Sequence, residues 1–152
     1  MNLQKALNEF RTIGGGLPWP FYLSLLAVLY ELTGQSEKGL AIIDEAFAAA
    51  APFNENWWNA ELYRLRGKLR YQQGATEAEV EAAYQQAISL AREQAALSLE
   101  LRATVSLAEL WHTQGRTAEA RQVLAAVYQQ FTEGFATPDL QAAQGLLTAL
   151  GN

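Results

Sequence analysis

The sequence is short of the side chains that carry most enzyme chemistry. Its 152 residues include no cysteine and a single histidine. Disulfide frameworks and thiolate chemistry are therefore excluded, and a reducing compartment, the cytoplasm, is expected. His112 is the one base available for a Ser-His-Asp arrangement, and its spacing from Glu109 matches half of a di-iron carboxylate site whose second half would need another histidine. We expect no catalytic residue, no metal site and no cofactor.

Positive charge and membrane-length apolar runs are also scarce. The 11 lysines and arginines are outnumbered by 16 aspartates and glutamates, giving a net charge of −5, which disfavours nucleic acid and anionic membrane surfaces as partners. The first residues lack the apolar core of a secretory signal, and the apolar run at 17–30 is too short to cross a bilayer as a helix. Hydrophobic residues still make up 50% of the chain, which predicts a single folded domain over residues 1–152.

No window alternates apolar and polar residues in the manner of a strand, so we expect an all-α fold without a sheet. What the chain has instead is a recurring helix ending: a glycine, any residue, then a hydroxyl. It occurs at Gly34-Gln35-Ser36, Gly74-Ala75-Thr76 and Gly115-Arg116-Thr117. Glycine adopts the left-handed conformation that ends a helix, and serine or threonine caps the next helix. Each site predicts the turn of a helical hairpin, and their spacing of 40 and 41 residues predicts an α-solenoid.

Glycines and prolines set the expected helix boundaries. Three consecutive glycines at 14–16 and Pro52 interrupt the helical periodicity, and Thr76 with Glu79 has the spacing of a capping box. We predict three hairpins at about 18–51, 56–95 and 97–133, with flanking helices at about 2–12 and 138–150.

The hairpins share a register of small and bulky residues. Ala27, Gly67 and Ala108 each lie seven residues before a turn glycine, and Tyr30 and Trp111 lie four before. A small residue is needed where two helices cross closely, and a bulky one fills the groove beside it. The pattern resembles the tetratricopeptide (TPR) repeat. HEAT-type repeats, which share the longer period, are the alternative, but they do not predict this turn and register.

Four runs carry a closer resemblance. They are residues 57–67 (WWNAELYRLRG), 98–103 (SLELRA), 115–121 (GRTAEAR) and 131–140 (FTEGFATPDL). They are similar to the C-terminal TPR region of large bacterial predicted ATPases, often fused to class III adenylate/guanylate cyclase or to regulatory DNA-binding domains. The resemblance implies the regulatory or scaffolding part of a signalling protein. It implies no ATPase activity here, because the chain has no Gly-x-x-x-x-Gly-Lys-Ser/Thr, and Arg70 departs from the bulky apolar residue of ordinary TPR repeats.

In a TPR solenoid the first helix of each hairpin lines the concave face, and the register maps candidate contact residues onto this face. In the first hairpin they are Phe21, Ser24, Val28 and Glu31. In the others they are Glu61, Arg64, Lys68, Tyr71, Arg102, Glu109 and His112. Arg64, Lys68 and Arg102 would form a basic patch suited to an acidic peptide, a chain terminus or an adjacent domain. The competing interpretation is a solvated face with internal pairs such as Glu61 with Arg64.

Two further expectations concern function. The main one is a non-catalytic protein-interaction module. The alternative is a small-molecule sensor whose groove has aromatic walls from Trp57, Tyr71, Trp111 and His112.

The helix at 2–12 has the character of the second half of a hairpin that lacks its first half. Its stripe of Leu3, Leu7 and Phe10 must cover the next hairpin or another chain. We therefore also predict a homodimer through the N-terminal helix.

Overall fold

All the secondary structure of the described residues is helical. The computed structural model describes residues 5–6, 8–9, 19–53 and 56–151, and no strand occurs in this part of the chain. The helices are α2 (Trp19–Leu32), α3 (Ser36–Ala50), α4 (Asn59–Gln72), α5 (Glu77–Glu93), α6 (Leu97–Thr113), α7 (Thr117–Tyr128) and α8 (Pro138–Gly151), with short 3-10 turns η1 (Ala51–Phe53) and η2 (Asn56–Trp58). The all-α prediction is confirmed.

The N-terminal expectations fall largely outside this description. Residues 5–6 and 8–9 are helical. Leu3, Leu7, Phe10 and the glycines at 14–16 lie outside the described residues, and so does the rest of the helix predicted at 2–12. None of the described helices is both long enough and apolar enough to span a lipid bilayer.

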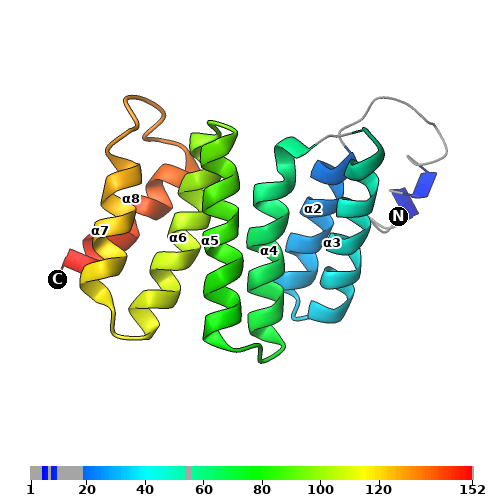
Figure 1. Ribbon diagram of the computed structural model, residues 1–152, viewed down its shortest axis with the longest axis horizontal. Helices are drawn as coiled ribbons and strands as arrows, with labels where there is room; N and C mark the ends of the chain where they lie inside the picture. Colours follow the sequence, from blue (N-terminus) through cyan, green and yellow to red (C-terminus); the bar gives the residue numbers. More distant parts are fainter. Residues whose placement is uncertain (1–4, 7, 10–18, 54–55, 152) are drawn as a thin grey trace.

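The helices stand side by side in chain order, from α2 and α3 at one end to α7 and α8 at the other (Figure 1). Each helix packs on the next one in the sequence. In addition, α2 contacts α4, α4 contacts α6, and α6 contacts α8. Because these four helices also touch one another in order, they share one side of the molecule, which we call the inner face.

The buried apolar side chains form a series of clusters along the row of helices. The first cluster comes from α2, α3 and α4, the last from α6, α7 and α8, and a third from α5 and α6 lies between them. Their most enclosed members, each at most 2% exposed, include Leu23, Ile43, Leu62, Leu65, Leu69, Val80, Leu101, Leu107, Leu124 and Val127.

The turn glycines adopt the conformation that the sequence predicts. The φ angles are +70° at Gly34, +85° at Gly74 and +77° at Gly115. After each glycine, the next residue donates its backbone N–H to a carbonyl five residues back. The bonds run from Gln35 to Tyr30 (2.8 Å), from Ala75 to Arg70 (3.0 Å) and from Arg116 to Trp111 (2.8 Å). These bonds satisfy carbonyls at the helix end that would otherwise be unpaired.

Only one of the three expected hydroxyl caps forms. Thr76 precedes α5, its hydroxyl accepts from the Glu79 N–H at 3.3 Å, and the Glu79 carboxylate accepts from the Thr76 N–H at 2.9 Å. The caps predicted at Ser36 and Thr117 are wrong. Those helices begin at these residues, two positions after the glycine rather than three, so Gln35 and Arg116 occupy the cap positions.

The hydroxyls freed from capping have other partners. Ser36 Oγ donates to Gln72 Oε1 at 2.8 Å and so joins α3 to α4. Thr117 Oγ1 lies 3.3 Å from His112 Nδ1 across the turn between α6 and α7.

The small residues of the shared register are where the helices approach closely. Ala27 and Ala108 are fully buried. A methyl group added at Gly67 would lie 2.8 Å from the Tyr84 ring. The α4–α5 contact therefore depends on the missing side chain at Gly67.

Candidate functional site

Two adjoining cavities lie on the inner face, each of about 270 Å³. The first is lined by Val28, Glu61, Arg64, Lys68, Arg102, Val105, Ser106, Glu109, Asp139 and Ala142. The second is lined by Glu31, Lys68, Tyr71, Gln72, Tyr84, Ser106, Glu109, Leu110 and Thr113. They share Lys68, Ser106 and Glu109, so we treat them together and call them the groove.

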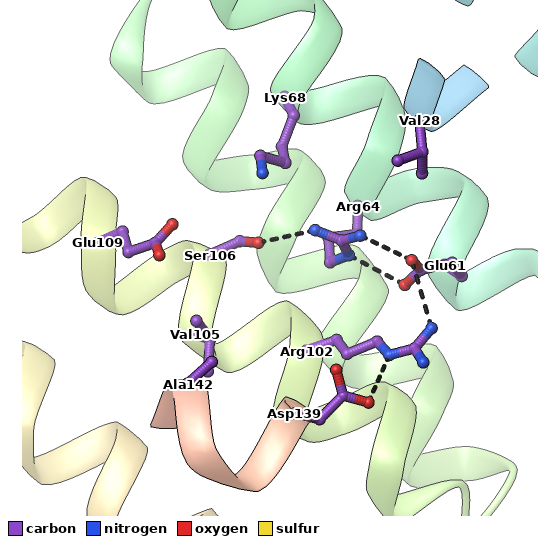
Figure 2. A pocket seen from close by; sticks show the side chains of 10 residues that line it. All are labelled: Val28, Glu61, Arg64, Lys68, Arg102, Val105, Ser106, Glu109, Asp139 and Ala142. Carbon is purple, nitrogen blue, oxygen red and sulfur yellow. Dashed lines mark hydrogen bonds and ion pairs between the residues drawn. The ribbon is translucent and has the colours of Figure 1, made fainter. Parts of the chain in front are cut away.

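The candidate residues of α4 come together in the groove with two of the three from α6. Glu61, Arg64, Lys68, Arg102 and Glu109 line the first cavity (Figure 2), and Tyr71 lines the second.

The remaining candidates divide between the groove and other places. His112 lines neither cavity and faces Thr117 instead. From α2, Val28 and Glu31 reach the groove, whereas Phe21 and Ser24 do not. Ser24 accepts a hydrogen bond from Trp58 Nε1 at 2.8 Å and helps to hold α2.

Glu61 is the centre of an ionic network that joins three helices. Its carboxylate, only 4% exposed as a residue, accepts from Arg64 Nη2 at 2.6 Å and from Arg64 Nε at 2.9 Å. Arg102 Nη1 lies 3.6 Å from the same carboxylate. Arg102 Nε in turn donates to Asp139 Oδ2 at 2.8 Å. Figure 2 shows this series of contacts, which runs from α4 through α6 to α8.

Arg64 is held firmly in its charged form. Burial alone would lower the pKa of its guanidinium, but the hydrogen bonds and negative charge of Glu61 outweigh burial, and the pKa is raised. Its remaining nitrogen, Nη1, donates to Ser106 Oγ at 3.3 Å. The three guanidinium nitrogens of Arg64 therefore all donate hydrogen bonds within the protein.

The basic patch expected from the sequence does not form as an excess of positive charge. Lys68 Nζ lies 3.7 Å from Glu31 Oε1, so each of the three cations faces a carboxylate. The groove residues comprise three cations, Arg64, Lys68 and Arg102, and four anions, Glu31, Glu61, Glu109 and Asp139. The helical register placed the cations correctly but could not show which carboxylates of α2 and α8 lie opposite them.

Glu109, Lys68 and Tyr71 are the groups least engaged within the protein. Glu109 is exposed and makes no hydrogen bond or ion pair with any other described residue. Lys68 has a long ion pair, and the Tyr71 ring is 44% exposed. Behind them, burial raises the pKa of Tyr84, which stays a neutral phenol. The groove thus offers an accessible carboxylate, a nearby ammonium group and an aromatic surface.

Asp139 and Ser106 are groove residues that the sequence reasoning missed. Ser106 lies four residues after Arg102 and three before Glu109, so the spacing of one helix face could have found it. Asp139 lies in the first turn of α8, which the sequence predicts only as a flanking helix, and nothing in its local sequence points to Arg102.

The aromatic walls expected for a small-molecule sensor are not assembled. Of the four residues named for them, Tyr71 alone lines either cavity. Trp57 packs beside Trp58 with ring centroids 5.2 Å apart. Trp111 is covered by the Arg116 guanidinium, 4.3 Å from its ring centroid.

Within the described part of the chain, no group of three or more histidines, aspartates or glutamates is arranged to hold a metal ion.

Comparison with known proteins gives a limited result. No family model matches the chain. It is 33% identical over 113 residues to an uncharacterized protein of Rhizobium meliloti (strain 1021), an alignment that covers 74% of this chain and 11% of the relative. The chain therefore spans a small part of the length of the relative it matches.

Proposed function

We propose that the chain is a non-catalytic protein-interaction module that binds an extended segment of a partner, or of a neighbouring domain, in the groove. The observation that carries this proposal is the pair of adjoining cavities along the inner face, lined by side chains from α2, α4, α6 and α8. A groove that crosses several helices suits a long, narrow guest rather than a compact one.

The proposal includes a TPR-like α-solenoid as the framework of the groove. Two features support it. The left-handed turn glycines recur at intervals of 40 and 41 residues, and alternate helices contact one another in sequence along one side. Stacked hairpins that contact only their neighbours are the hallmark of such arrays.

The charges of the groove favour a guest that carries a basic side chain, in place of the acidic guest expected from the sequence. Arg64 and Arg102 are already bonded to Glu61 and Asp139. An acidic guest would have to compete with those carboxylates, whereas Glu109 can pair with a lysine or arginine without losing a partner. The exposed Tyr71 ring nearby can support the same cation.

The proposed setting is the regulatory C-terminal part of a bacterial signalling ATPase or cyclase. This rests on the resemblance of the four sequence runs described above. Similarity to a segment of a much longer bacterial protein is compatible with it, and that protein is itself uncharacterized.

The test compares short basic, neutral and acidic peptides by nuclear magnetic resonance titration of the labelled protein. We expect basic peptides to bind most tightly and to shift the amide signals of α4 and α6. Glu109→Gln should weaken their binding by up to about fivefold, since an exposed ion pair contributes at most about 1 kcal/mol.

Glu37→Gln, an exposed glutamate on α3 outside the groove, is the matched control and should leave binding unchanged. Acidic peptides that bind more tightly than basic ones, or shifts that avoid α4 and α6, would contradict the proposal.

The sensor alternative receives little support. Charged side chains line much of the walls of both cavities, whereas small-molecule sites are predominantly apolar with few polar groups. The sensor alternative would be supported by a metabolite that raises the melting temperature of the protein and shifts the amide signals of the groove residues.

A further inference from the structure

Tyr84 reaches the groove from a helix that is not part of the inner face. It belongs to α5, which packs on α4 and α6, yet its side chain lines the second cavity. The ring lies against Gly67 of α4, where an added methyl group would be 2.8 Å from a ring carbon. A side chain at position 67 would collide with the ring, so the glycine allows the phenol to extend into the groove.

The hydroxyl of Tyr84 lies among the charged residues of the groove. Burial raises the pKa of the phenol, and of the charges that act on it Arg64 opposes this rise, whereas Glu109 and Glu31 add to it. These three residues all line the groove. The hydroxyl therefore points toward the groove and keeps its proton, so it is a hydrogen-bond donor at neutral pH.

Two hydroxyl protons in the second cavity have no acceptor among the described residues. Tyr84, only 4% exposed, makes no hydrogen bond with any of them. Ser106, also 4% exposed, accepts from Arg64 Nη1 at 3.3 Å but donates to no group in the described part of the chain (Figure 2). A guest that fills the cavity must supply an acceptor or leave both donors buried and unpaired.

A basic side chain alone cannot supply that acceptor. The ammonium group of lysine and the guanidinium group of arginine carry donors only. Either group suits the carboxylate of Glu109, which lines the same cavity, but neither can accept from the two hydroxyls. A main-chain carbonyl oxygen has two lone pairs and can accept from both. The cavity therefore fits a basic residue together with the peptide bond beside it.

We propose that the second cavity binds the main chain of the guest next to its basic residue. The hydroxyls of Tyr84 and Ser106 donate to a main-chain carbonyl oxygen, and the Glu109 carboxylate pairs with the basic side chain. This inference rests on the proposed function, because it requires a basic segment in the groove. It adds that the groove selects a lysine or arginine within a polypeptide over a free organic cation.

Two probes separate the carbonyl from the cation. The first is acetyl-Gly-Lys-Gly-amide, a blocked tripeptide that has a lysine side chain and main-chain carbonyls. The second is n-butylamine, which carries the same ammonium group on the same four-carbon chain and has no carbonyl. Nuclear magnetic resonance titration of the labelled protein gives both dissociation constants. We expect the tripeptide to bind about tenfold more tightly than butylamine.

Tyr84→Phe identifies the source of this preference, because it removes the hydroxyl and keeps the ring that packs on Gly67. It should weaken tripeptide binding about fivefold and leave butylamine binding unchanged. Adding Ser106→Ala should abolish the remaining preference. Tyr63→Phe is the matched control, since Tyr63 packs on Phe47 and lines neither cavity of the groove. This control should change the binding of neither probe.

Three results would overturn the inference and leave the groove proposal standing. One is a tripeptide that binds no more tightly than butylamine. Another is a Tyr84→Phe variant that binds both probes as the wild type does. The third is equal weakening of both probes in Tyr84→Phe, which would make Tyr84 a support of the groove and not a donor to the guest. In all three cases Glu109→Gln still weakens the binding of both probes. If neither probe binds, or if Glu109→Gln has no effect, the groove proposal fails and this inference fails with it.

Discussion

Glu61 illustrates how burial changes what an ion pair contributes. It accepts two hydrogen bonds from Arg64 and lies near Arg102, and its side chain is only 5% exposed. Arg66 and Asp44 also pair closely, at 2.7 Å, but the Asp44 side chain is 73% exposed. Both pairs join an arginine to a carboxylate at similar distances, 2.6 and 2.7 Å, and the carboxylates differ strongly in burial.

We expect Glu61→Ala to lower the free energy of unfolding by about 3 kcal/mol, because it leaves the buried Arg64 guanidinium without a counter-charge. Asp44→Ala should cost less than about 1 kcal/mol, since water replaces the exposed carboxylate. Urea unfolding of both variants measures the difference. Equal losses of unfolding free energy in the two variants would mean that the network around Glu61 contributes no more than an exposed ion pair.

Ala95 holds a backbone conformation that suits glycine. Its φ is +53°, and it is the one non-glycine residue with positive φ in the described part of the chain. It occupies the turn between α5 and α6, where Ala96 donates to the Ala91 carbonyl at 2.8 Å, the same bond that follows each turn glycine.

Ala95→Gly should therefore raise the free energy of unfolding by about 0.5–1 kcal/mol, since glycine enters the left-handed region without a steric penalty. Gly115→Ala is the reciprocal control. A methyl group there would meet no atom within 4 Å, so its expected loss comes from the backbone alone. Thermal unfolding midpoints should move in opposite directions, and a shared direction would contradict this account.

At the scale of single helices, the start of α5 differs from the starts of α3 and α7. The turn before α5 has one more residue ahead of its helix, which places Thr76 at the cap and leaves Thr117 inside the first turn of α7. Thr76→Ala should cost about 1 kcal/mol. Thr117→Ala, a chemically identical change at the equivalent sequence position, should cost clearly less in the same denaturation experiment.

The capping box also predicts a pH dependence. Hydrogen bonds from the Thr76 backbone and then from its side chain lower the pKa of Glu79 below its ordinary value of 4.5. Because the folded-state pKa is the lower one, this stabilisation is present above the ordinary pKa and is lost as the pH falls through the lowered value. The difference in stability between wild type and Thr76→Ala should therefore shrink in acid. A difference that stays constant down to the acid transition would rule out a contribution from the hydrogen bond between the Thr76 hydroxyl and Glu79, since the backbone hydrogen bond is present in both proteins.

The helices themselves could be predicted because their signals are local. The glycine at each turn, the proline that opens α8 and the small residues at close crossings act through their immediate neighbours. The groove was predictable in part for the same reason, since Glu61, Arg64 and Lys68 follow from the spacing of one helix.

The pairing of charges between helices could not be predicted. Whether Asp139 meets Arg102 depends on how far α8 is rotated and shifted against α6, which apolar packing decides. The residues at the helix caps could not be predicted either, because one additional residue in a turn moves the hydroxyl into or out of the cap position.

On the scale of the whole molecule, the core is divided. The cluster formed by α2, α3 and α4 shares no buried residue with the one formed by α6, α7 and α8. The two ends touch directly where α4 meets α6 and are otherwise joined through α5. Stability in such an arrangement is a sum of local terms and neighbour terms, so one end can open while the other stays folded.

Amide hydrogen exchange tests this division with two equivalent core changes. Leu124→Ala in α7 and Ile43→Ala in α3 each remove a fully buried side chain and should each cost about 2–5 kcal/mol. We expect Leu124→Ala to reduce protection in α6, α7 and α8 while α2 and α3 keep theirs, and Ile43→Ala to do the reverse. If either substitution lowered protection uniformly from α2 to α8, the chain would unfold as a single cooperative unit. The groove, which draws on helices from both ends, would then open only on global unfolding.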